Sequence, residues 1–330
     1  ICATSGDTGA AAVEAFKDKE AINLFVFYPE GRVSPVQQKQ MTSVSSKNIF
    51  CVSIKGNFDD CQSIVKKIFN DRVFTKEHNI SAVNSINWVR VMAQIVYFFY
   101  SALHVGSADK PVSFSVPTGN FGDIFAGYAA YKMGLPIEKL CIATNRNDIL
   151  ARFISSGSYA VGNVIPTYSP SMDIQVASNF ERLLFDFFDR DAKEVNFIME
   201  KLNIFGKFDV EGHILDKIRE IFVSKSVSEE ETLDAMSYEW NKNNLLIDPH
   251  TAVGISAGRS MLSNESSILV FLATADPSKF SEAVVKATGQ RPILPSRVSK
   301  IISEKENYKN FFPDVENIKE YIAKKNKFFI

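Results

Sequence analysis

The first sixteen residues, ICATSGDTGAAAVEAF, combine hydroxyl groups, glycines and a carboxylate at the start of an alanine-rich helix. Ser5, Asp7 and Thr8 are residue types that cap helix N-termini, and Gly6 and Gly9 allow the backbone to turn tightly. The N–H groups of a first helical turn have no partner within the helix and favour negative charge. The stretch therefore predicts an anion site, with a well-capped helix and nothing more as the alternative.

A second loop of this kind, SVPTGNFGD, covers residues 115–123 and again leads from a strand into a helix. Its backbone amides can form a cup for a phosphate group; they belong to Gly119, Asn120, Phe121, Gly122 and Asp123. The loop is neither a Walker motif nor the GxGxxG dinucleotide fingerprint, so a nucleotide is not the favoured owner of that phosphate. A purely structural turn between strand and helix remains the alternative.

Two further sites carry polar side chains where chemistry is possible. The segment NSINWVR offers Asn84, Ser85, Asn87 and Arg90, and a helix places Asn87 and Arg90 on one face. Arginine presents a fork of donors that suits phosphate or carboxylate, although a capped helix with an ordinary surface arginine explains the segment equally well. Thr274 lies at the C-terminal end of the predicted strand SILVFLATAD, where an α/β sheet exposes functional groups.

The elements that must position these residues follow an α/β pattern. A helix is predicted from about Thr8 to Lys19, then strands at Ile22–Pro29 and Asn48–Ile54 with a helix beginning near Pro35 between them. Strands of five to eight residues that alternate with helices indicate βαβ units and parallel sheets. The fold class expected is α/β, with two three-layer domains built on open sheets.

The length of 330 residues exceeds what a single core usually supports, so two domains are expected. We place the first at residues 1–83, as a small α/β domain that contains the SGDTG helix, and the second at residues 84–330. Within the second domain, the region from about Gly162 to Leu246 reads as a largely helical insertion. It delays the next strand until Ser267–Asp276.

Composition excludes several classes of function. The net charge of −1 gives no broad basic field for nucleic acid or an anionic membrane, and no apolar run reaches the length of a membrane span. The four cysteines, Cys2, Cys51, Cys61 and Cys141, are scattered, and no HExxH pattern is present. A reduced, cytoplasmic protein without a structural zinc is expected. Because the chain begins without Met, inside what reads as a strand, we expect further sequence upstream.

Seven segments, in order along nearly the whole chain, resemble the threonine synthase family, whose members are pyridoxal-phosphate enzymes of the tryptophan-synthase-β-like fold, fold type II. The segments are ATSGDTGAAA, YPEGRVSPVQQKQM, NSINWVR, VPTGNFGDIFAGYAA, SPSMDIQVASNFERLLF, DPHTAVG and FLATADPSKF. Seven ordered matches are far more specific than one glycine loop, so the functional interpretation of each segment is preferred.

The resemblance implies pyridoxal 5′-phosphate as the cofactor, with its phosphate held by the TGNFGD loop and its pyridine nitrogen facing Thr274. It places Ser5 and Asp7 near the substrate carboxylate and the cofactor ring hydroxyl. It further implies that Thr8, Ser85, Arg90 and Asn120 clasp the substrate phosphate. Asp276 stands where the family often has histidine, and a carboxylate this close to Thr274 leaves the assignment of Thr274 slightly open.

The implied reaction converts O-phospho-L-homoserine and water to L-threonine and phosphate, by γ-elimination followed by β-hydration. Two alternatives stay open: a related phospho-lyase that releases a 2-oxo acid, and a non-catalytic ligand-binding relative. The partner implied is this small molecule alone, with the protein a monomer or a homodimer.

The lysine that forms the Schiff base is expected upstream of Ile1, so no catalytic residue is assigned within the chain. The segment AFKDK places Lys17 nine residues beyond Thr8 on one predicted helix. At the helical rise this is about 13 Å from the end where substrate would bind. Lys17 is therefore interpreted as a surface lysine.

Overall fold

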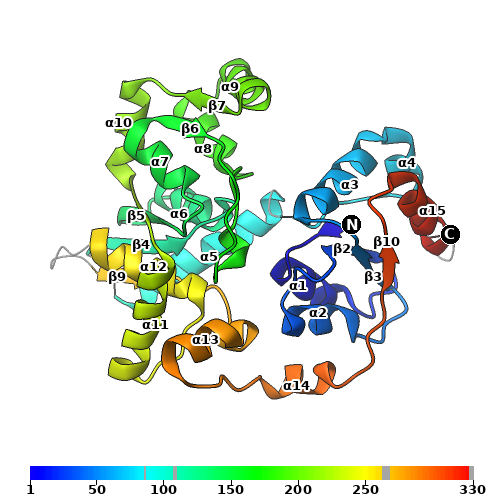
Figure 1. Cartoon of the computed structure of the whole chain (residues 1–330). Coiled ribbons are helices and arrows are strands. Elements are labelled where there is room, and N and C mark those ends of the chain that lie inside the picture. The colour runs from blue at the N-terminus through cyan, green and yellow to red at the C-terminus, as the bar shows by residue number, and fades with distance from the viewer. Residues whose placement is uncertain (85–86, 107–109, 262–267, 327–330) are drawn as a thin grey trace. The chain divides into compact units, whose positions relative to one another are not determined.

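A computed structural model of the chain describes residues 1–84, 87–106, 110–261 and 268–326. The chain divides into two compact units, one made of residues 1–84 and 293–330 and the other of residues 85–292 (Figure 1). Each unit carries a four-stranded parallel sheet with helices, as expected for the α/β class.

The first unit is built on a sheet of order β1-β2-β3-β10. Its strands are β1 (Cys2–Ala3), β2 (Leu24–Pro29), β3 (Ile49–Ile54) and β10 (Lys309–Phe311). Its helices are α1 (Asp7–Phe16), α2 (Pro35–Thr42), α3 (Phe58–Asn70), α4 (Arg72–Glu77), α14 (Ser296–Ile302) and α15 (Val315–Asn326).

Both faces of this first sheet are buried, which explains why β2 is apolar throughout rather than alternating. Phe25 and Phe27 point into a core shared with α3 and α15. Val26 and Tyr28 point into the opposite core, which is shared with α1 and α2. The result is a three-layer arrangement of helices, sheet and helices.

The second unit has a sheet of order β8-β5-β4-β9 and a separate antiparallel pair, β6 with β7. Its strands are β4 (Val112–Pro117), β5 (Ile137–Thr144), β6 (Ser158–Ala160), β7 (Lys207–Asp209), β8 (Phe222–Ser226) and β9 (Ile268–Phe271). Its helices are α5 (Trp88–His104), α6 (Gly122–Lys132), α7 (Ile149–Ser156), α8 (Phe180–Phe187), α9 (Ala192–Phe205), α10 (Gly212–Ile221), α11 (Glu229–Asn243), α12 (Pro249–Met261) and α13 (Ser281–Thr288), with short 3₁₀ turns η1 (Pro170–Met172) and η2 (Pro277–Phe280).

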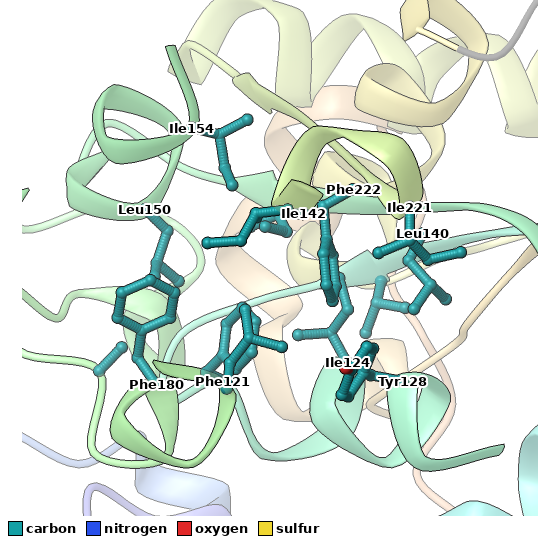
Figure 2. Packing of buried hydrophobic residues seen from close by; sticks show 14 of the residues in the cluster. Phe121, Ile124, Tyr128, Leu140, Ile142, Leu150, Ile154, Phe180, Ile221 and Phe222 are labelled. Atoms are coloured by element: carbon teal, nitrogen blue, oxygen red, sulfur yellow. The ribbon is translucent and has the colours of Figure 1, made fainter. Parts of the chain in front are cut away.

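The second sheet is also covered on both faces. Leu140 and Ile142 of β5 join a large core with Phe121, Ile124 and Phe222 (Figure 2). The intervening residues of β5, Cys141 and Ala143, face α12 instead. Alternating residues of one strand thus supply the two cores, and both sheets have the three-layer form expected from the sequence.

The C-terminal segment lies elsewhere than predicted. The sequence placed residues 84–330 in one domain, but residues 293–330 belong to the first unit. There β10 pairs in parallel with β3, Lys309 opposite Val52, and Ile318 of α15 packs in the core beside α3. This correction rests on a long-range strand pairing that local periodicity does not encode.

The predicted helical insertion also needs correction. Residues 162–246 do contain four helices, α8 to α11, but they also contain β7 and β8. Strand β8 pairs in parallel with β5, Leu140 opposite Phe222, and forms an edge of the main sheet. The region is therefore partly integral to the second sheet.

Helix α1 ends three residues earlier than predicted, at Phe16 instead of Lys19. The side-chain amide of Asn48 explains the difference, because its Nδ2 donates to the carbonyl oxygens of Phe16, Lys19 and Ile22. These bonds hold a turn between helix and strand, and β2 accordingly starts at Leu24.

Candidate functional site

Thr4 organises the start of α1 in the first unit, a role that the sequence assigned to Ser5, Asp7 and Thr8. The Thr4 hydroxyl accepts hydrogen bonds from the N–H groups of Gly6, at 2.9 Å, and Gly9, at 2.8 Å. Gly6 occupies the N-cap position of α1, with φ of 138°. As a glycine it has no side chain, so no side-chain hydrogen bond comes from this position. Ser5, Asp7 and Thr8 lie half-buried along this turn.

Helix α2 supports the same turn from its own side. Its N-cap, Ser34, accepts from the N–H of Gln37, and Pro35 occupies the first helical position, where its missing N–H costs nothing. The buried Gln37 side chain lies against Gly6, and Met41 lies against Gly9. The segment PVQQKQM thus holds the backbone of the SGDTG turn in place.

In the second unit, the loop 118–123 begins helix α6 in an unusual way. Phe121 occupies the N-cap in the left-handed region, with φ of 64°, and within the described parts of the chain no side chain caps α6 there. Its ring is buried and packs edge-on against Phe180, with centroids 5.2 Å apart. The core thereby fixes the turn that starts α6, and the first amides of a helix, which lack an acceptor within the helix, can bind anions.

Neighbouring segments clamp the rest of this loop. The Asn120 carbonyl oxygen accepts from the backbone and side-chain amides of Asn179, at 3.0 and 3.1 Å. The Asn120 Oδ1 atom accepts from the Ser178 hydroxyl. A Cβ on Gly119 would lie 2.9 Å from the carbonyl oxygen of Ser171, so only glycine fits there. The loop is therefore held rigidly before any ligand binds.

Asp123 stands in the first turn of α6, next to Gly122. Its Oδ1 atom is buried and has no hydrogen-bond partner among the described residues. Burial raises the pKa of the Asp123 carboxyl to about 7. Near neutral pH this carboxyl therefore carries less negative charge than an exposed aspartate, which limits its repulsion of an anion in the loop.

Thr274 lies beyond the end of β9, and its backbone N–H donates to the hydroxyl of Thr251. Its side chain is exposed within the second unit. Asp276 is occupied otherwise: it caps η2, accepting at Oδ1 from the N–H and the hydroxyl of Ser278 at 2.9 and 2.5 Å. The carboxylate that complicated the interpretation of Thr274 thus has a structural role of its own.

The NSINWVR segment is divided between the units. Asn84 belongs to the first unit, Ser85 lies outside the described residues, and Asn87 caps α5 by accepting from the N–H of Val89. Arg90 lies half-buried on the first turn of α5. The cap of α5 is therefore Asn87, which was predicted to lie on the helix itself beside Arg90.

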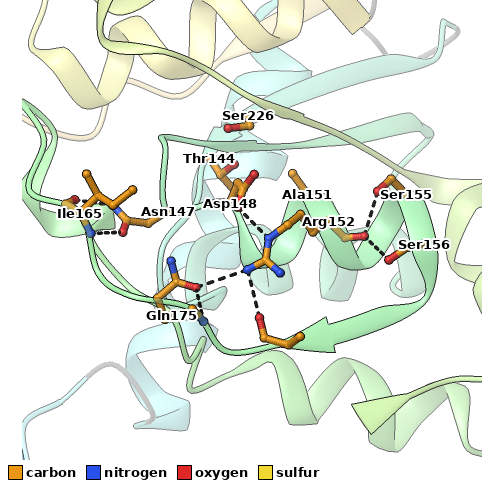
Figure 3. A network of polar contacts seen from close by, with 12 residues as sticks. Thr144, Asn147, Asp148, Ala151, Arg152, Ser155, Ser156, Ile165, Gln175 and Ser226 are labelled. Carbon is orange, nitrogen blue, oxygen red and sulfur yellow. Dashed lines mark hydrogen bonds and ion pairs between the residues drawn. The ribbon is translucent and has the colours of Figure 1, made fainter. Parts of the chain in front are cut away.

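A buried polar network that was not predicted from the sequence follows β5. Asp173 accepts from the side-chain amides of Asn145 and Asn147, both at 2.9 Å, and from the Thr167 hydroxyl at 2.6 Å. The Asn147 amide also exchanges hydrogen bonds with the backbone of Ile165 (Figure 3). The clustered asparagines of TNRND, directly after a buried strand, were the available signal.

Arg152 of α7 braces the same region. Its Nε atom contacts Asp148 at 2.8 Å, and its guanidinium donates to the carbonyl oxygen of Ala160 and to Gln175 (Figure 3). Gln175 in turn accepts from the N–H of Gly162. The long segment 161–179 is thus fixed at both ends, and it is the segment that clamps Asn120.

Lys17 lies at the C-terminal end of α1, where it forms an ion pair with Glu14 at 2.9 Å. The helix spans ten residues, so Lys17 is about 15 Å from the N-terminal turn. This placement supports its interpretation as a surface lysine.

Three further observations bear on the expected partners. The four cysteines are buried and form no disulfide. Within residues 1–84, 87–106, 110–261 and 268–326, no cluster of three or more acidic, histidine or cysteine side chains has the arrangement of a metal site. Over those same ranges, none of the helices is both long enough and apolar enough to traverse a bilayer.

Family models match two parts of the chain. Residues 1–201 match "Pyridoxal-phosphate dependent enzyme", and residues 251–322 match "Threonine synthase, C-terminal". The chain is 48% identical to the threonine synthase of Pseudomonas aeruginosa over 92% of its own length and 65% of that protein. It is 44% identical to the threonine synthase of Saccharomyces cerevisiae over 98% of its length and 68% of that protein. The chain belongs to the threonine synthase family.

Solved structures agree with this family. The pyridoxal-phosphate-bound threonine synthase of Brucella melitensis superposes with a TM-score of 0.93 and 47% identity, over 99% of this chain and 70% of that one. The yeast enzyme gives a TM-score of 0.89 and 43% identity, over 98% of this chain and 69% of that one. Maize serine racemase, at 14% identity and a TM-score of 0.57 over 86% of this chain and 76% of that one, shares the fold alone. The chain spans about two thirds of the length of its threonine synthase relatives.

Proposed function

We propose that this protein is a threonine synthase, which converts O-phospho-L-homoserine and water to L-threonine and phosphate. The observation that carries the proposal is identity of 41–48% to threonine synthases across 86–98% of the chain. Relatives named threonine synthase-like 2 match less well, at 33% and 34% identity. Because relatives with this second name also match the chain, a related phospho-lyase that gives a 2-oxo acid is the second candidate function.

Pyridoxal 5′-phosphate is the cofactor that this proposal requires, and the second unit fits it. The start of α6 has amides with no acceptor within the helix and no capping side chain among the described residues, and Gly119 lets the loop pack directly against the backbone of Ser171. We assign the cofactor phosphate to Gly119, Asn120, Phe121, Gly122 and Asp123. The bound cofactor supplies the electron sink for the carbanions of the reaction.

Thr274 is assigned to the pyridine nitrogen. A hydroxyl group at that position exchanges a hydrogen bond without imposing a negative charge, so it leaves the ring nitrogen largely unprotonated. The N–H bond from Thr274 to Thr251 fixes the backbone that carries this hydroxyl. Asp276 does not compete for the role, because its Oδ1 is held by Ser278.

The substrate-binding residues are assigned from the family resemblance, and each unit is described by itself. In the first unit, Ser5, Asp7 and Thr8 lie on the first turn of α1. The helix amides there favour the substrate carboxylate and phosphate. Asp7 is assigned to the cofactor ring hydroxyl. In the second unit, Arg90 and Asn120 supply a charged fork and an amide for the substrate phosphate; Ser85 is assigned with them from the family resemblance alone. Binding the leaving phosphate both orients it and stabilises its growing charge.

We propose that the Schiff-base lysine lies outside residues 1–330, since Lys17 is remote from the N-terminal turn of its helix. Borohydride reduction of the cofactor-loaded protein, followed by peptide mass mapping, locates it. An adduct on a peptide within residues 1–330 would contradict this assignment. From the four free cysteines, we also propose that the protein works in the cytoplasm. We further propose that it is a monomer or a homodimer, and sedimentation tests this oligomeric state.

The activity is tested by incubating the purified protein and cofactor with O-phospho-L-homoserine and quantifying threonine, 2-oxobutyrate and phosphate. Threonine equal in amount to phosphate supports the proposal. A 2-oxo acid in place of threonine would assign the phospho-lyase reaction, and intact substrate after cofactor binding would indicate a binding relative.

Arg90→Gln is expected to raise KM about tenfold or more, with exposed Arg291→Gln as the matched control.

A further inference from the structure

Asp248 is the N-cap of α12 and is completely buried. Its carbonyl oxygen accepts the first helical hydrogen bond, from Ala252 at 3.0 Å, and Pro249 follows at the first helical position. Its Oδ1 atom accepts from the N–H groups of His250, at 2.9 Å, and Thr251, at 3.4 Å. The helix start therefore fixes where this carboxylate lies.

The side chains of His250 and Thr251 bind the same carboxylate. His250 Nδ1 lies 2.8 Å from Asp248 Oδ1, and the Thr251 hydroxyl donates to Asp248 Oδ2. His250 Nε2 accepts from the backbone N–H of Ser171 at 3.2 Å, so Nε2 carries no proton and Nδ1 donates to Asp248. One buried carboxylate thus sets the orientation of both side chains.

The histidine branch reaches the phosphate loop. Ser171 lies in η1, and the backbone of this turn forms a wall against Gly119. A Cβ on Gly119 would be 2.9 Å from the Ser171 carbonyl oxygen and 3.2 Å from the Met172 Cα. Because the contact is between backbones, any shift of η1 is transmitted to the loop.

The threonine branch reaches the end of β9. Thr251 commits its hydroxyl proton to Asp248, which leaves a lone pair to accept from the N–H of Thr274 at 3.3 Å. Thr274 is 23 residues away in sequence and follows a short strand. The same carboxylate therefore anchors the backbone that carries the Thr274 hydroxyl.

We propose that Asp248, His250 and Thr251 are positioning residues, which hold the loop 118–123 and Thr274 at the separation that the cofactor needs. The inference rests on the proposed function, because it takes the loop and Thr274 as the two cofactor contacts. It assigns a role to the DPHT segment beyond starting a buried helix. If these three residues only stabilised the helix, substituting them would have no specific effect on cofactor binding.

Thr251→Val tests the threonine branch, because it keeps the side-chain volume and removes both hydrogen bonds of the hydroxyl. Thr251→Ser keeps the hydroxyl and serves as the rescue variant. Thr232→Val is the matched control: Thr232 is also fully buried in the second unit, but its hydroxyl donates only to the Ser228 carbonyl within the start of α11. The readouts are the Kd for pyridoxal 5′-phosphate, from the absorbance of the bound cofactor, and urea unfolding of the cofactor-free protein.

We expect Thr251→Val to raise the Kd about tenfold, with Thr251→Ser close to the parent. We expect Thr232→Val to lower stability by less than Thr251→Val, which also removes a donor from the buried Asp248 carboxylate, and to leave the Kd unchanged. A Kd for Thr251→Val within twofold of the parent, or an equal rise in Thr232→Val, overturns the inference. If the parent itself binds no cofactor, the proposed function fails instead.

His250→Phe tests the histidine branch by removing the acceptor for Ser171 while keeping a ring beside Phe280, whose centroid lies 4.7 Å from that of His250. The readout is amide hydrogen exchange in the cofactor-free protein. We expect faster exchange at Ser171 and in residues 118–123, with exchange in α11 unchanged. Unchanged exchange at residues 118–123 would show that the histidine does not position the loop.

Discussion

The side chain of Gln37 fills the space beside Gly6, so closely that a Cβ on Gly6 would lie 2.5 Å from Oε1 of Gln37. Gly6 also has φ of 138°, a conformation that side chains disfavour. Two separate constraints, one from the backbone and one from a buried neighbour on α2, therefore require glycine at the start of the SGDTG turn.

Gly6→Ala is expected to lower the free energy of unfolding by more than about 2 kcal/mol, since strain and collision act together. Urea denaturation followed by circular dichroism measures the loss. Gly31→Ala is the control, because its φ is also positive while a Cβ there meets nothing within 4 Å among the described residues. Equal losses in the two variants would show that neither the Gln37 contact nor the larger φ of Gly6 adds to the cost of a positive φ.

Gly119→Ala is expected to weaken the binding of pyridoxal 5′-phosphate about tenfold or more, because the new methyl group must displace the backbone of Ser171. A cofactor titration measures the change. Gly212→Ala, at the open start of α10, should leave binding unchanged, since a Cβ there has no described atom within 4 Å. Unaltered affinity in Gly119→Ala would remove the loop from the cofactor site.

The titration of Asp123 should contribute a loss of stability in the cofactor-free protein as pH rises from about 4 to about 7. Its pKa is about 7 in the folded protein and about 3.9 in an unfolded chain, so the folded state binds the extra proton in this window. Each unit of difference corresponds to about 1.4 kcal/mol. Urea unfolding at several pH values measures the slope.

Asp123→Asn should flatten that slope and raise stability at pH 8 relative to the parent, because an amide carries no charge to bury. Asp234→Asn, on an exposed position of α11, should keep the slope of the parent. A parent slope that survives in Asp123→Asn would assign the titration to another group.

Ile318→Ala is expected to destabilise the first unit by about 2–5 kcal/mol, because Ile318 is fully buried beside α3. Ile293→Ala, at a side chain that is 92% exposed, should change stability by less than about 0.5 kcal/mol. Urea unfolding compares the two. Similar values would contradict the assignment of α15 to the core of the first unit.

Local patterns in the sequence predicted much of the fold. Apolar runs bounded by turn residues located β2 and β3 within one or two residues, because strands buried on both faces have to be apolar throughout. The glycine loops correctly marked the starts of α1 and α6. Whether these loops bind the substrate and cofactor groups assigned to them stays a prediction.

What the sequence did not reveal depends on contacts between distant residues. The caps of α1 were expected from Ser5, Asp7 and Thr8, but Thr4 binds Gly9 from outside the helix. The link from Asp248 through His250 to Ser171 joins residues 79 apart. Asp248 and Pro249 are residue types typical of a helix start, whereas the hydrogen bonds that join this start to η1 and Thr274 required the folded chain.

The pairing of β10 with β3 has a consequence for how the protein is made. The second unit is formed by one continuous segment of the chain, so all of its residues have been synthesised while the ribosome is still adding residues 293–330. The sheet of the first unit waits for residues 309–311, and α15 for the residues after them. During synthesis β3 presents an unpaired edge until then, and domains generally fold as units as their residues emerge. The unit that is begun first is therefore the one completed last.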